Sequence, residues 1–204
     1  MEKPQIVRLR TVTSTQDIAR GLPRGSMVVA DHQSAGRGRL DRRWEAPKGS
    51  ALLVSYVLKP DPLLSLVAGV AAAEACGPEV RLKWPNDLLL DGRKLGGILV
   101  EVKDGKAVCG IGVNLTWAPE GCAMLAQPRD DLLDRLSGRL ESWTAAPSEA
   151  VLERWRELSA TLGRRVRVEV AGDSVEGTAQ DIGPRGELIV DGRSFVAGSV
   201  THLS

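Results

Sequence analysis

Two Asp-Gly dipeptides, Asp91-Gly92 and Asp104-Gly105, constrain the fold of this chain more than any other feature. Each is a strong signal for a tight β-hairpin turn, because both central positions of such a turn need a left-handed backbone that Asp and Gly tolerate. A strand is predicted between them at residues 95–103, and its antiparallel partner at residues 107–115. Strands joined in this way form a meander, so the chain is not a run of βαβ crossovers.

Helices and further strands are predicted on both sides of this meander. A helix is expected to start at Ser14-Thr15, since Ser and Thr are good N-caps. The other predicted helices are 62–76, 130–143 and 148–162, the other strands are 6–12, 26–30, 51–59 and 79–84, and the loops are 31–50 and 116–128. We therefore expect an α+β fold, with a mixed, largely antiparallel sheet flanked by helices.

The pattern changes near Gly163. Short alternating apolar runs follow, such as Val166, Val168 and Val170, and glycine-containing turns separate them at short intervals. About forty residues of short strands with tight turns indicate a small barrel. We predict two domains, at residues 1–162 and 163–204.

The charge of the chain is balanced overall but uneven along it. The formal net charge is +1, from 27 Lys+Arg and 26 Asp+Glu. This balance argues against a protein whose main task is to coat nucleic acid or an anionic membrane, since those need a large basic surplus. Five basic residues nevertheless fall within one short stretch, so anion chemistry is expected in one place: Arg37, Arg39, Arg42, Arg43 and Lys48.

The cysteine and histidine content excludes two further classes. Three cysteines without C-x-x-C spacing and only two histidines argue against a disulfide scaffold and a structural zinc site.

Residues 1–20 carry charges throughout and show no signal-peptide core. The longest apolar stretch, residues 63–76, is too short to span a bilayer. A soluble, cytoplasmic protein without a membrane partner is expected.

The first candidate motif is the glycine- and arginine-rich loop that begins at Gln33 and includes Gly36 to Arg39. Glycines allow backbone N–H groups to converge on an anion, and arginines offer paired donors to phosphate or carboxylate oxygens. Trp44 is expected to anchor the far end of the loop. The alternatives are a solvated basic loop or a nucleic-acid-binding patch.

The second candidate is Lys83-Trp84-Pro85-Asn86-Asp87, at the end of a predicted strand. Asp87 could hold Mg²⁺, which prefers one or two carboxylates together with phosphate oxygens and water. The alternative is a turn in which Asn86 and Asp87 only satisfy backbone donors.

Two further candidates lie on the predicted meander. Lys94 opens a strand whose Gly96 and Gly97 allow close approach to the backbone, and it could neutralise a carboxylate and a phosphate together. The alternative is an ordinary solvated lysine beside a turn. Gly110-x-Gly112-x-Asn114 is only a weak dinucleotide-binding signal, because no third glycine or clear helix follows.

The order of these motifs resembles the biotin protein ligases from about residue 6 to the C-terminus. The resemblance is carried by Ser14-Thr15, Gln-x-x-Gly-Arg-Gly-Arg at 33–39, Trp44, Lys-Trp-Pro-Asn-Asp-Leu at 83–88, Arg-Lys-Leu-x-Gly-Ile-Leu-x-Glu at 93–101, Gly-x-Gly-x-Asn-Leu at 110–115 and Ala-Gly-Ser-Val at 197–200. It implies a class II synthetase-like biotin/lipoate ligase catalytic domain followed by an SH3-like barrel.

The resemblance also implies a reaction in two steps. Biotin and ATP, with Mg²⁺, give biotinyl-5′-AMP and pyrophosphate, and biotin is then transferred to a specific lysine of a biotin carboxyl carrier domain of acetyl-CoA or pyruvate carboxylase. No protein nucleophile is needed, because catalysis rests on holding two anions together.

The family's functional residues map onto matching positions of this chain. Those implied in catalysis are Lys94, Arg37 and Arg39. Those implied in biotin binding are Ser14, Thr15, Gln16, Gln33, Gly36, Arg37, Gly38, Arg39, Lys94, Gly96 and Gly97. Those implied in binding ATP and the adenylate are Arg39, Arg42, Arg43, Trp44, Asn86, Asp87, Lys94 and Asn114, with Asp87 as the candidate Mg²⁺ ligand.

The chain departs from the family pattern at Leu40-Asp41 and at residues 50–53, and Trp117 is the only aromatic residue of the 116–128 loop. A lipoate-protein ligase is the nearest alternative, and a regulatory nucleic-acid-binding module is a second. We expect a short form without an N-terminal DNA-binding domain, and no DNA partner. The resemblance also implies a possible homodimer that pairs sheet edges, at residues 99–103 or 108–113.

Overall fold

Residues 3–170 and 172–203 are described by the computed structural model, and within them two main sheets form, one of seven strands and one of five. The larger has the order β1-β2-β5-β9-β8-β7-β6. Only the β1–β2 pair of this sheet, among the described strands, is parallel. The mixed, largely antiparallel sheet predicted from the sequence is confirmed. Its strands are β1 (Ile6–Leu9), β2 (Met27–Ala30), β5 (Ala51–Leu58), β6 (Arg81–Lys83), β7 (Asp87–Leu90), β8 (Arg93–Lys103) and β9 (Lys106–Asn114).

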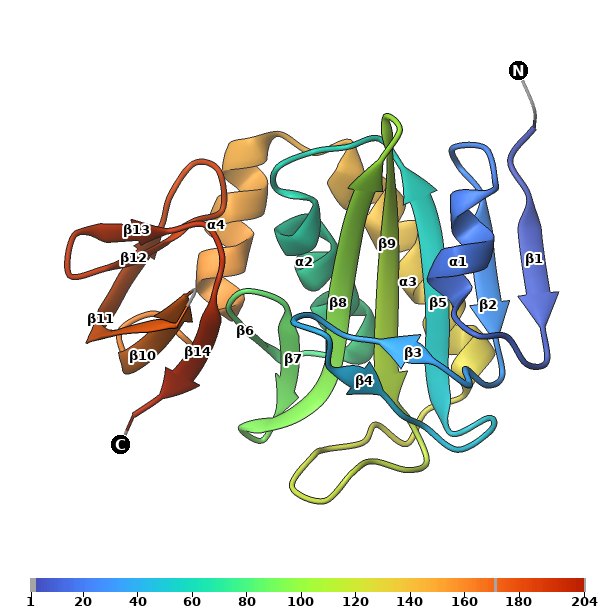
Figure 1. Ribbon diagram of the computed structural model, residues 1–204, viewed down its shortest axis with the longest axis horizontal. Coiled ribbons are helices and arrows are strands. Elements are labelled where there is room, and N and C mark those ends of the chain that lie inside the picture. Colours follow the sequence, from blue (N-terminus) through green and yellow to red (C-terminus); the bar gives the residue numbers. More distant parts are fainter. Residues whose placement is uncertain (1–2, 171, 204) are drawn as a thin grey trace.

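The two faces of the large sheet are covered differently (Figure 1). Helices α2 (Leu64–Cys76), α3 (Arg129–Thr144) and α4 (Ser148–Leu158) lie behind it, whereas α1 (Thr15–Arg20) lies in front. Strand alternation divides the apolar side chains between the faces. In β2, Met27 and Val29 belong to the main core and Val28 packs with α1. Helix α2 is apolar on nearly all sides because it is enclosed by the sheet, α3 and α4.

The meander follows the predicted turns. Asp91 and Gly92 have φ of 51° and 72°, and Asp104 and Gly105 have φ of 50° and 70°. The second turn joins β8 to β9, which pair over their whole common length. The first joins β8 to β7, a strand that was not predicted. Ahead of β7 in the chain lies β6, and the two strands are joined by a turn at Trp84–Asn86, where the Trp84–Pro85 peptide bond is cis.

Several predicted boundaries are wrong. The segment 31–50, expected to be a loop, contains a short hairpin of β3 (Gly36–Arg37) and β4 (Arg43–Trp44) in front of the large sheet. Its turn places Leu40 and Asp41 at φ of 54° and 57°, a conformation that Leu seldom adopts. The strand predicted at 6–12 ends at Leu9, and the helix predicted to reach residue 162 ends at Leu158.

One of the two edges proposed for a homodimer is not an edge. Residues 108–113 lie in β9, which is hydrogen-bonded to β5 on one side and to β8 on the other. Residues 99–103 lie in the part of β8 beyond β7, so in the described part of the chain they pair with β9 alone.

The C-terminal segment, predicted to be a small barrel, forms a five-stranded antiparallel sheet that fits this prediction, at the end of the molecule next to β6 (Figure 1). Its order is β13-β12-β11-β10-β14, and its inward side chains, among them Val166, Val168 and Ile182, continue the main core. The predicted domain division at 162/163 stays a prediction, and residues 1–2, 171 and 204 lie outside the description. The strands are β10 (Arg165–Val170), β11 (Asp173–Ile182), β12 (Leu188–Val190), β13 (Arg193–Phe195) and β14 (Ser199–His202).

Among the described residues, we find no helix with the length and apolar character needed to cross a bilayer.

Two helical glycines provide a test of this packing. A Cβ added at Gly138 of α3 meets no atom within 4 Å, so Gly138→Ala should raise the free energy of unfolding by about 0.5–1 kcal/mol through helix propensity. At Gly69 of α2 the added Cβ would lie 3.4 Å from Leu82 Cδ2, an ordinary van der Waals distance within the core, so the same change should stabilise the protein by at least as much. Urea unfolding of both variants measures the two gains, and a loss of stability in Gly69→Ala would contradict the packing described for α2.

Candidate active site

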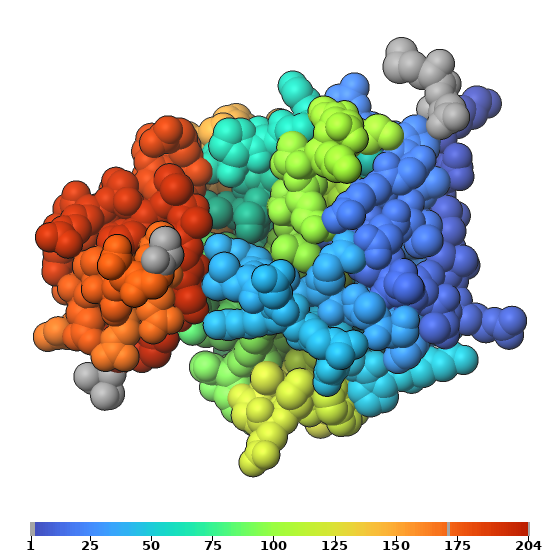
Figure 2. All heavy atoms as spheres, in the orientation of Figure 1, coloured from blue at the N-terminus to red at the C-terminus, as the bar shows by residue number. Residues whose placement is uncertain are grey.

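A cavity of about 280 Å³ lies between the β3–β4 hairpin and the front face of the large sheet. In the space-filling view the hairpin covers this face beside the C-terminal sheet (Figure 2). The cavity is lined by most of the residues singled out from the sequence: Ser14, Thr15, Gln16, Gln33, Arg37, Gly38, Arg39, Arg42, Arg43, Trp44, Asn86, Asp87, Lys94, Gly97 and Asn114.

The floor of the cavity is a patch of backbone without side chains. Gly97 of β8 lies directly opposite Gly112 of β9. A Cβ on Gly112 would stand 2.7 Å from Trp44 Cε2, and one on Gly97 would stand 3.7 Å from Trp44 Cζ3. The Trp44 ring therefore lies on this glycine pair and anchors the hairpin to the sheet, as the sequence predicted.

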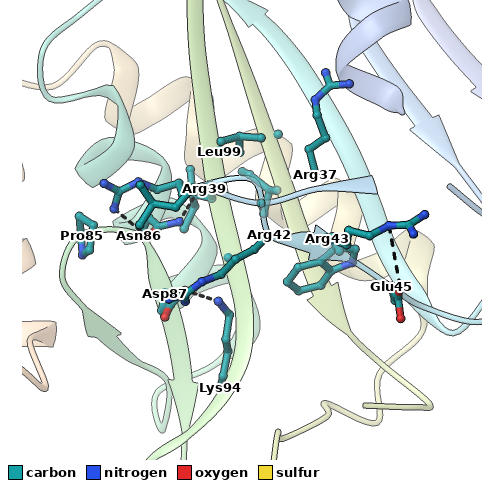
Figure 3. A pocket seen from close by; sticks show the side chains of 18 of the residues that line it. Arg37, Arg39, Arg42, Arg43, Glu45, Pro85, Asn86, Asp87, Lys94 and Leu99 are labelled. Carbon is teal, nitrogen blue, oxygen red and sulfur yellow. Dashed lines mark hydrogen bonds and ion pairs between the residues drawn. The ribbon is translucent and has the colours of Figure 1, made fainter. Parts of the chain in front are cut away.

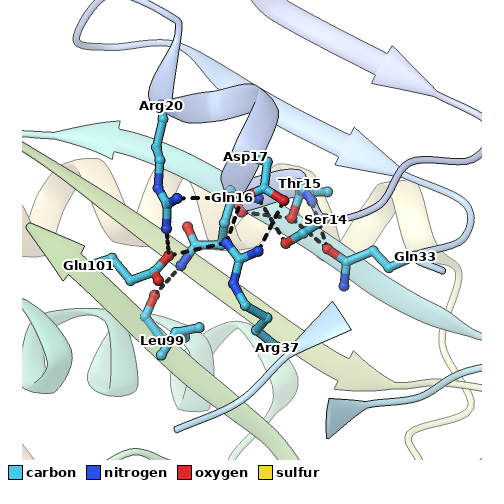
Figure 4. Close-up of polar contacts among 10 residues, drawn as sticks. Ser14, Thr15, Gln16, Asp17, Arg20, Gln33, Arg37, Leu99 and Glu101 are labelled. Carbon is cyan, nitrogen blue, oxygen red and sulfur yellow. Dashed lines mark hydrogen bonds and ion pairs between the residues drawn. The ribbon is translucent and has the colours of Figure 1, made fainter. Parts of the chain in front are cut away.

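One end of the cavity offers neutral hydrogen-bonding groups (Figure 4). Ser14 caps α1 by accepting a hydrogen bond from the backbone N–H of Gln16. Gln33 Oε1 accepts from both the backbone N–H and the hydroxyl of Thr15, at 2.7 and 3.0 Å, and Thr15 Oγ1 lies 2.7 Å from Ser55 Oγ. These bonds fix the helix start and the Gln33 segment to the sheet.

Gln16 occupies the space that Gly110 leaves open. A Cβ on Gly110 would lie 3.2 Å from the Gln16 amide carbon. The amide nitrogen of Gln16 donates to Leu99 O at 3.0 Å, while its buried Oε1 has no hydrogen-bond partner among the described residues. An acceptor left unpaired beside a cavity is available to a ligand that carries an N–H group.

Arg37 is held by two carboxylates (Figure 4). Its guanidinium donates to both oxygens of Asp17, at 2.8 and 3.0 Å, and lies 3.5 Å from Glu101 Oε2. Arg20 also pairs with Glu101, at 2.7 Å. The hydrogen bonds from Arg37 hold the pKa of Asp17 below its usual value, and Asp17 raises the pKa of Arg37.

Arg39 points the other way, toward Asn86 (Figure 3). It donates to Asn86 Oδ1 at 3.3 Å, and the Asn86 amide nitrogen donates to Ile98 O at 2.7 Å. Asn86 thus orients Arg39 from the large sheet. Burial lowers the pKa of Arg39, so a bound anion would stabilise its charge.

The second end of the cavity is cationic. Lys94 Nζ lies 2.5 Å from Asp87 Oδ1, and Arg42 extends toward the same carboxylate (Figure 3). Lys83 lines this end as well, and burial lowers its pKa, assisted by the nearby positive charges of Lys94 and Arg42. Four cations, Arg39, Arg42, Lys83 and Lys94, thus gather around Asp87, an arrangement suited to a polyphosphate.

Three predicted residues are placed differently from the rest. Gly36 packs against the Trp44 backbone carbonyl, and Gly96 packs against Gly112 O, so neither lines the cavity. Arg43 lines its rim and pairs with Glu45 at 3.9 Å, away from Lys94.

Asn114 lines the cavity and also holds the loop 116–128. Its amide nitrogen donates to Ala123 O at 3.0 Å, and the backbone N–H of Ala123 donates to Lys94 O. This segment has no helix or strand within its described residues, as predicted.

The site also contains residues that the sequence did not reveal. Asp17 and Glu101 are separated from Arg37 by 20 and 64 positions, and no local spacing connects them. Lys83 stands in the Lys-Trp-Pro-Asn-Asp motif, which was the available signal. Ser199 and Val200 of β14 form part of the wall, and only the tertiary fold brings them there.

The side chains around Asp87 show what kind of Mg²⁺ site the protein could form. The described residues contain no group of three or more His, Cys, Asp or Glu side chains that could form a metal cage. Asp87 offers one partly exposed carboxylate beside the cationic end. This fits a Mg²⁺ ion held mainly by ligand phosphates and water, and does not fit one held by protein ligands alone.

Comparison with known proteins identifies the family. Residues 6–116, more than half of the chain, match the family model described as "Biotin/lipoate A/B protein ligase family". The chain belongs to this family. Residues 161–203 of this family member also match the "Biotin protein ligase C terminal domain".

Individual relatives agree with this assignment. The Mycobacterium tuberculosis protein named biotin--[acetyl-CoA-carboxylase] ligase is 37% identical over 212 residues, covering 88% of this chain and 79% of that protein. The biotin protein ligase from Aquifex aeolicus, solved with biotin and ATP, matches the fold at a TM-score of 0.83, with 24% identity and 98% of each chain covered. The Helicobacter pylori biotin acetyl coenzyme A carboxylase synthetase, solved with bound biotinylated ATP, has a TM-score of 0.80 at 26% identity, covering 95% of this chain and 99% of that one.

The packing of Trp44 on the floor can be tested with Gly112→Ala. The added methyl group would stand 2.7 Å from the Trp44 ring, so the ring must move and the hairpin must lose its anchor. We expect the free energy of unfolding to fall by about 1–3 kcal/mol and proteolysis within residues 33–48 to accelerate. Gly21→Ala, whose Cβ has room at 3.6 Å from Ile18 O, is the matched control. Unchanged protection of the hairpin in Gly112→Ala would contradict this packing.

Proposed function

We propose that this chain is a biotin protein ligase, which activates biotin with ATP and transfers it to a lysine of a biotin carboxyl carrier domain. The observation that carries the proposal is one cavity with two chemically different ends. The end at Ser14, Thr15 and Gln33 offers neutral hydrogen-bonding groups, and the end at Lys94 gathers cations around Asp87. Biotin, a neutral ring that carries a carboxylate, and ATP have the complementary chemistry.

The names of the relatives support the same substrates. The M. tuberculosis relative is named for biotin and acetyl-CoA carboxylase, and the H. pylori structure holds biotinylated ATP. The match of residues 161–203 to a domain named for biotin protein ligases favours biotin over lipoate.

In the proposed biotin end, the ureido ring lies against the start of α1. Its two N–H groups need acceptors and its carbonyl oxygen needs a donor. The Ser14 hydroxyl and the Gln33 amide nitrogen are the groups that can donate, and the unpaired Gln16 Oε1 can accept, while Thr15 holds Gln33 in place. The Trp44 ring, which lies on Gly97 and Gly112, would offer an apolar surface to the hydrocarbon part of the ligand.

In the proposed first step, a biotin carboxylate oxygen attacks the α-phosphorus of ATP. The new O–P bond forms as the bond to the bridging oxygen breaks, and pyrophosphate leaves. Lys94 would exchange Asp87 for the two reacting anions and lower their repulsion, while Arg37 and Arg39 close over the ligand from the hairpin. In the second step the acceptor lysine nitrogen attacks the acyl carbon, AMP leaves, and the nitrogen loses a proton.

When bound, Mg²⁺ would neutralise charge on the phosphates and assist the departure of pyrophosphate. Asp87 is the residue that we propose to hold it.

We further propose the acceptor and the setting of the reaction. The name of the M. tuberculosis relative supports the carrier domain of acetyl-CoA carboxylase, and the corresponding domain of pyruvate carboxylase shares the same chemistry. The need for ATP supports the cytoplasm as the compartment. The half of β8 at residues 99–103 supports a homodimer that pairs two copies edge to edge.

A pyrophosphate-release assay tests the proposal directly. The protein is incubated with ATP, Mg²⁺ and either biotin or lipoate, and a carrier domain is then added and weighed by mass spectrometry. We expect release with biotin and a mass increase of one biotin on the carrier domain. Release with lipoate only would replace the proposal by a lipoate-protein ligase, and release with neither acid would refute both.

The role of Lys94 can be separated from general charge effects. Lys94→Ala should slow biotin-dependent pyrophosphate release by roughly 100- to 1,000-fold, because the developing charge at phosphorus loses a preorganised cation. Lys59→Ala, exposed just after the end of β5 and away from the cavity, is the matched control. Near-normal turnover in Lys94→Ala would show that the assigned role is wrong.

A further inference from the structure

The C-terminal sheet meets the large sheet through a short chain of hydrogen bonds next to the cavity. The backbone N–H of Trp84 donates to Thr161 Oγ1 at 3.1 Å, and Thr161 Oγ1 lies 3.2 Å from His202 Nε2. Thr161 is fully buried between α4 and β10, and His202 ends β14. The chain of bonds therefore joins β6 to β14, on opposite sides of the junction seen in Figure 1.

Both strands joined in this way supply walls of the cavity. Trp84 directly follows Lys83 and shortly precedes Asn86 and Asp87, and all of these residues line the cavity. On β14, Ser199 and Val200 line it, two to three positions before His202. A change at the Thr161–His202 pair thus reaches both walls, although neither residue lines the cavity itself.

The direction of the hydrogen bonds is set by the chemistry of a hydroxyl. Thr161 Oγ1 accepts from Trp84, so its single hydrogen is free to be donated to His202 Nε2, which must then be unprotonated. A neutral His202 agrees with its surroundings, where burial lowers its pKa to about 4 and the positive charges of Lys83 and Arg164 act in the same direction. If His202 is replaced by an apolar side chain of the same size, the hydrogen of the buried Thr161 hydroxyl has no acceptor.

We propose that Thr161 and His202 are positioning residues for the nucleotide end of the site, because their hydrogen bond holds β6 and β14 at the spacing that places Lys83, Asn86 and Asp87 against the ligand phosphates. The inference rests on the proposed function for the identity of that ligand. Its geometric part concerns the cavity alone and can be tested by binding.

A second contact also attaches the C-terminal sheet to the rest of the molecule, but it does not reach the cavity. Arg156 of α4 pairs with Asp181 of β11 at 2.7 Å and donates to Ile182 O at 2.9 Å. Neither Arg156 nor Asp181 lines the cavity. Arg156→Gln therefore weakens the attachment of the C-terminal sheet while leaving β6 and β14 joined, and it is the matched control.

The experiment compares two disruptive variants with two conservative ones. Thr161→Val and His202→Leu remove the hydroxyl and the acceptor, whereas Thr161→Ser and His202→Gln retain them. Dissociation constants for α,β-methylene-ATP are measured by calorimetry, and KM for ATP and kcat are measured by biotin-dependent pyrophosphate release. The melting temperature of each variant is recorded alongside. Because Thr161 is fully buried, the half-buried His202 provides an independent pair of variants if Thr161→Val does not fold.

We expect both disruptive variants to raise the dissociation constant and KM for ATP by about tenfold, the factor that corresponds to one hydrogen bond of ordinary strength. Their kcat should change much less. Thr161→Ser and His202→Gln should stay within about twofold of the wild type, and Arg156→Gln should lower the melting temperature with KM unchanged.

Three outcomes would overturn the inference: unchanged nucleotide binding in both disruptive variants, no rescue by the conservative ones, or an equal rise of KM in Arg156→Gln. Failure of the proposed function is distinguishable from these. If the wild type binds the analogue but releases no pyrophosphate with biotin, the proposed function is wrong. The positioning role is then still decided by the dissociation constants of the variants.

Discussion

The site depends on one close approach, that of the Trp44 ring to the glycine pair Gly97 and Gly112. The pairing of β8 with β9 sets these two residues opposite one another, and the absence of both side chains leaves a flat piece of backbone large enough for an indole. The hairpin rests on the sheet at this point, and the cavity is the space that remains around it. A longer side chain at Gly112 would raise the hairpin and open the site to water.

The cations of the site show how local charge differs from net charge. Arg39 and Arg42 come from the hairpin, Lys83 from β6 and Lys94 from β8, and Asp87 faces them all. The chain as a whole is almost neutral. Burial disfavours the charged forms of Arg39 and Lys83. An anionic ligand would stabilise these charged forms and so offset part of the free-energy cost of burying them. Arg37 differs, because Asp17 and Glu101 already neutralise it.

Elements whose conformation depends on neighbouring residues can be predicted from the sequence. The two Asp-Gly turns predict the meander, and the apolar run at 62–76 predicts the buried helix. The hairpin of β3 and β4 was missed because Leu40-Asp41 is not a residue pair typical of a tight turn. The resemblance assigns Gly36 and Gly96 to biotin binding, which stays a prediction, and in the structure their missing side chains make room for Trp44 O and Gly112 O. The partners of Arg37 and the wall formed by β14 depend on contacts between distant segments, which spacing along the chain does not encode.

The turn at Leu40 and Asp41 affects the free energy of the hairpin as a whole. A left-handed backbone costs an L-amino acid other than glycine roughly 1–2 kcal/mol, and Asp bears it more easily than Leu. Two backbone hydrogen bonds close the turn, from Gly38 N–H to Arg42 O at 2.7 Å and from Arg42 N–H to Arg39 O at 3.2 Å. Opening the hairpin breaks these bonds but releases the unfavourable backbone conformation. An Asn-Gly turn would avoid most of this conformational cost, so the hairpin that covers the cavity is less stable than the same hairpin would be with that turn.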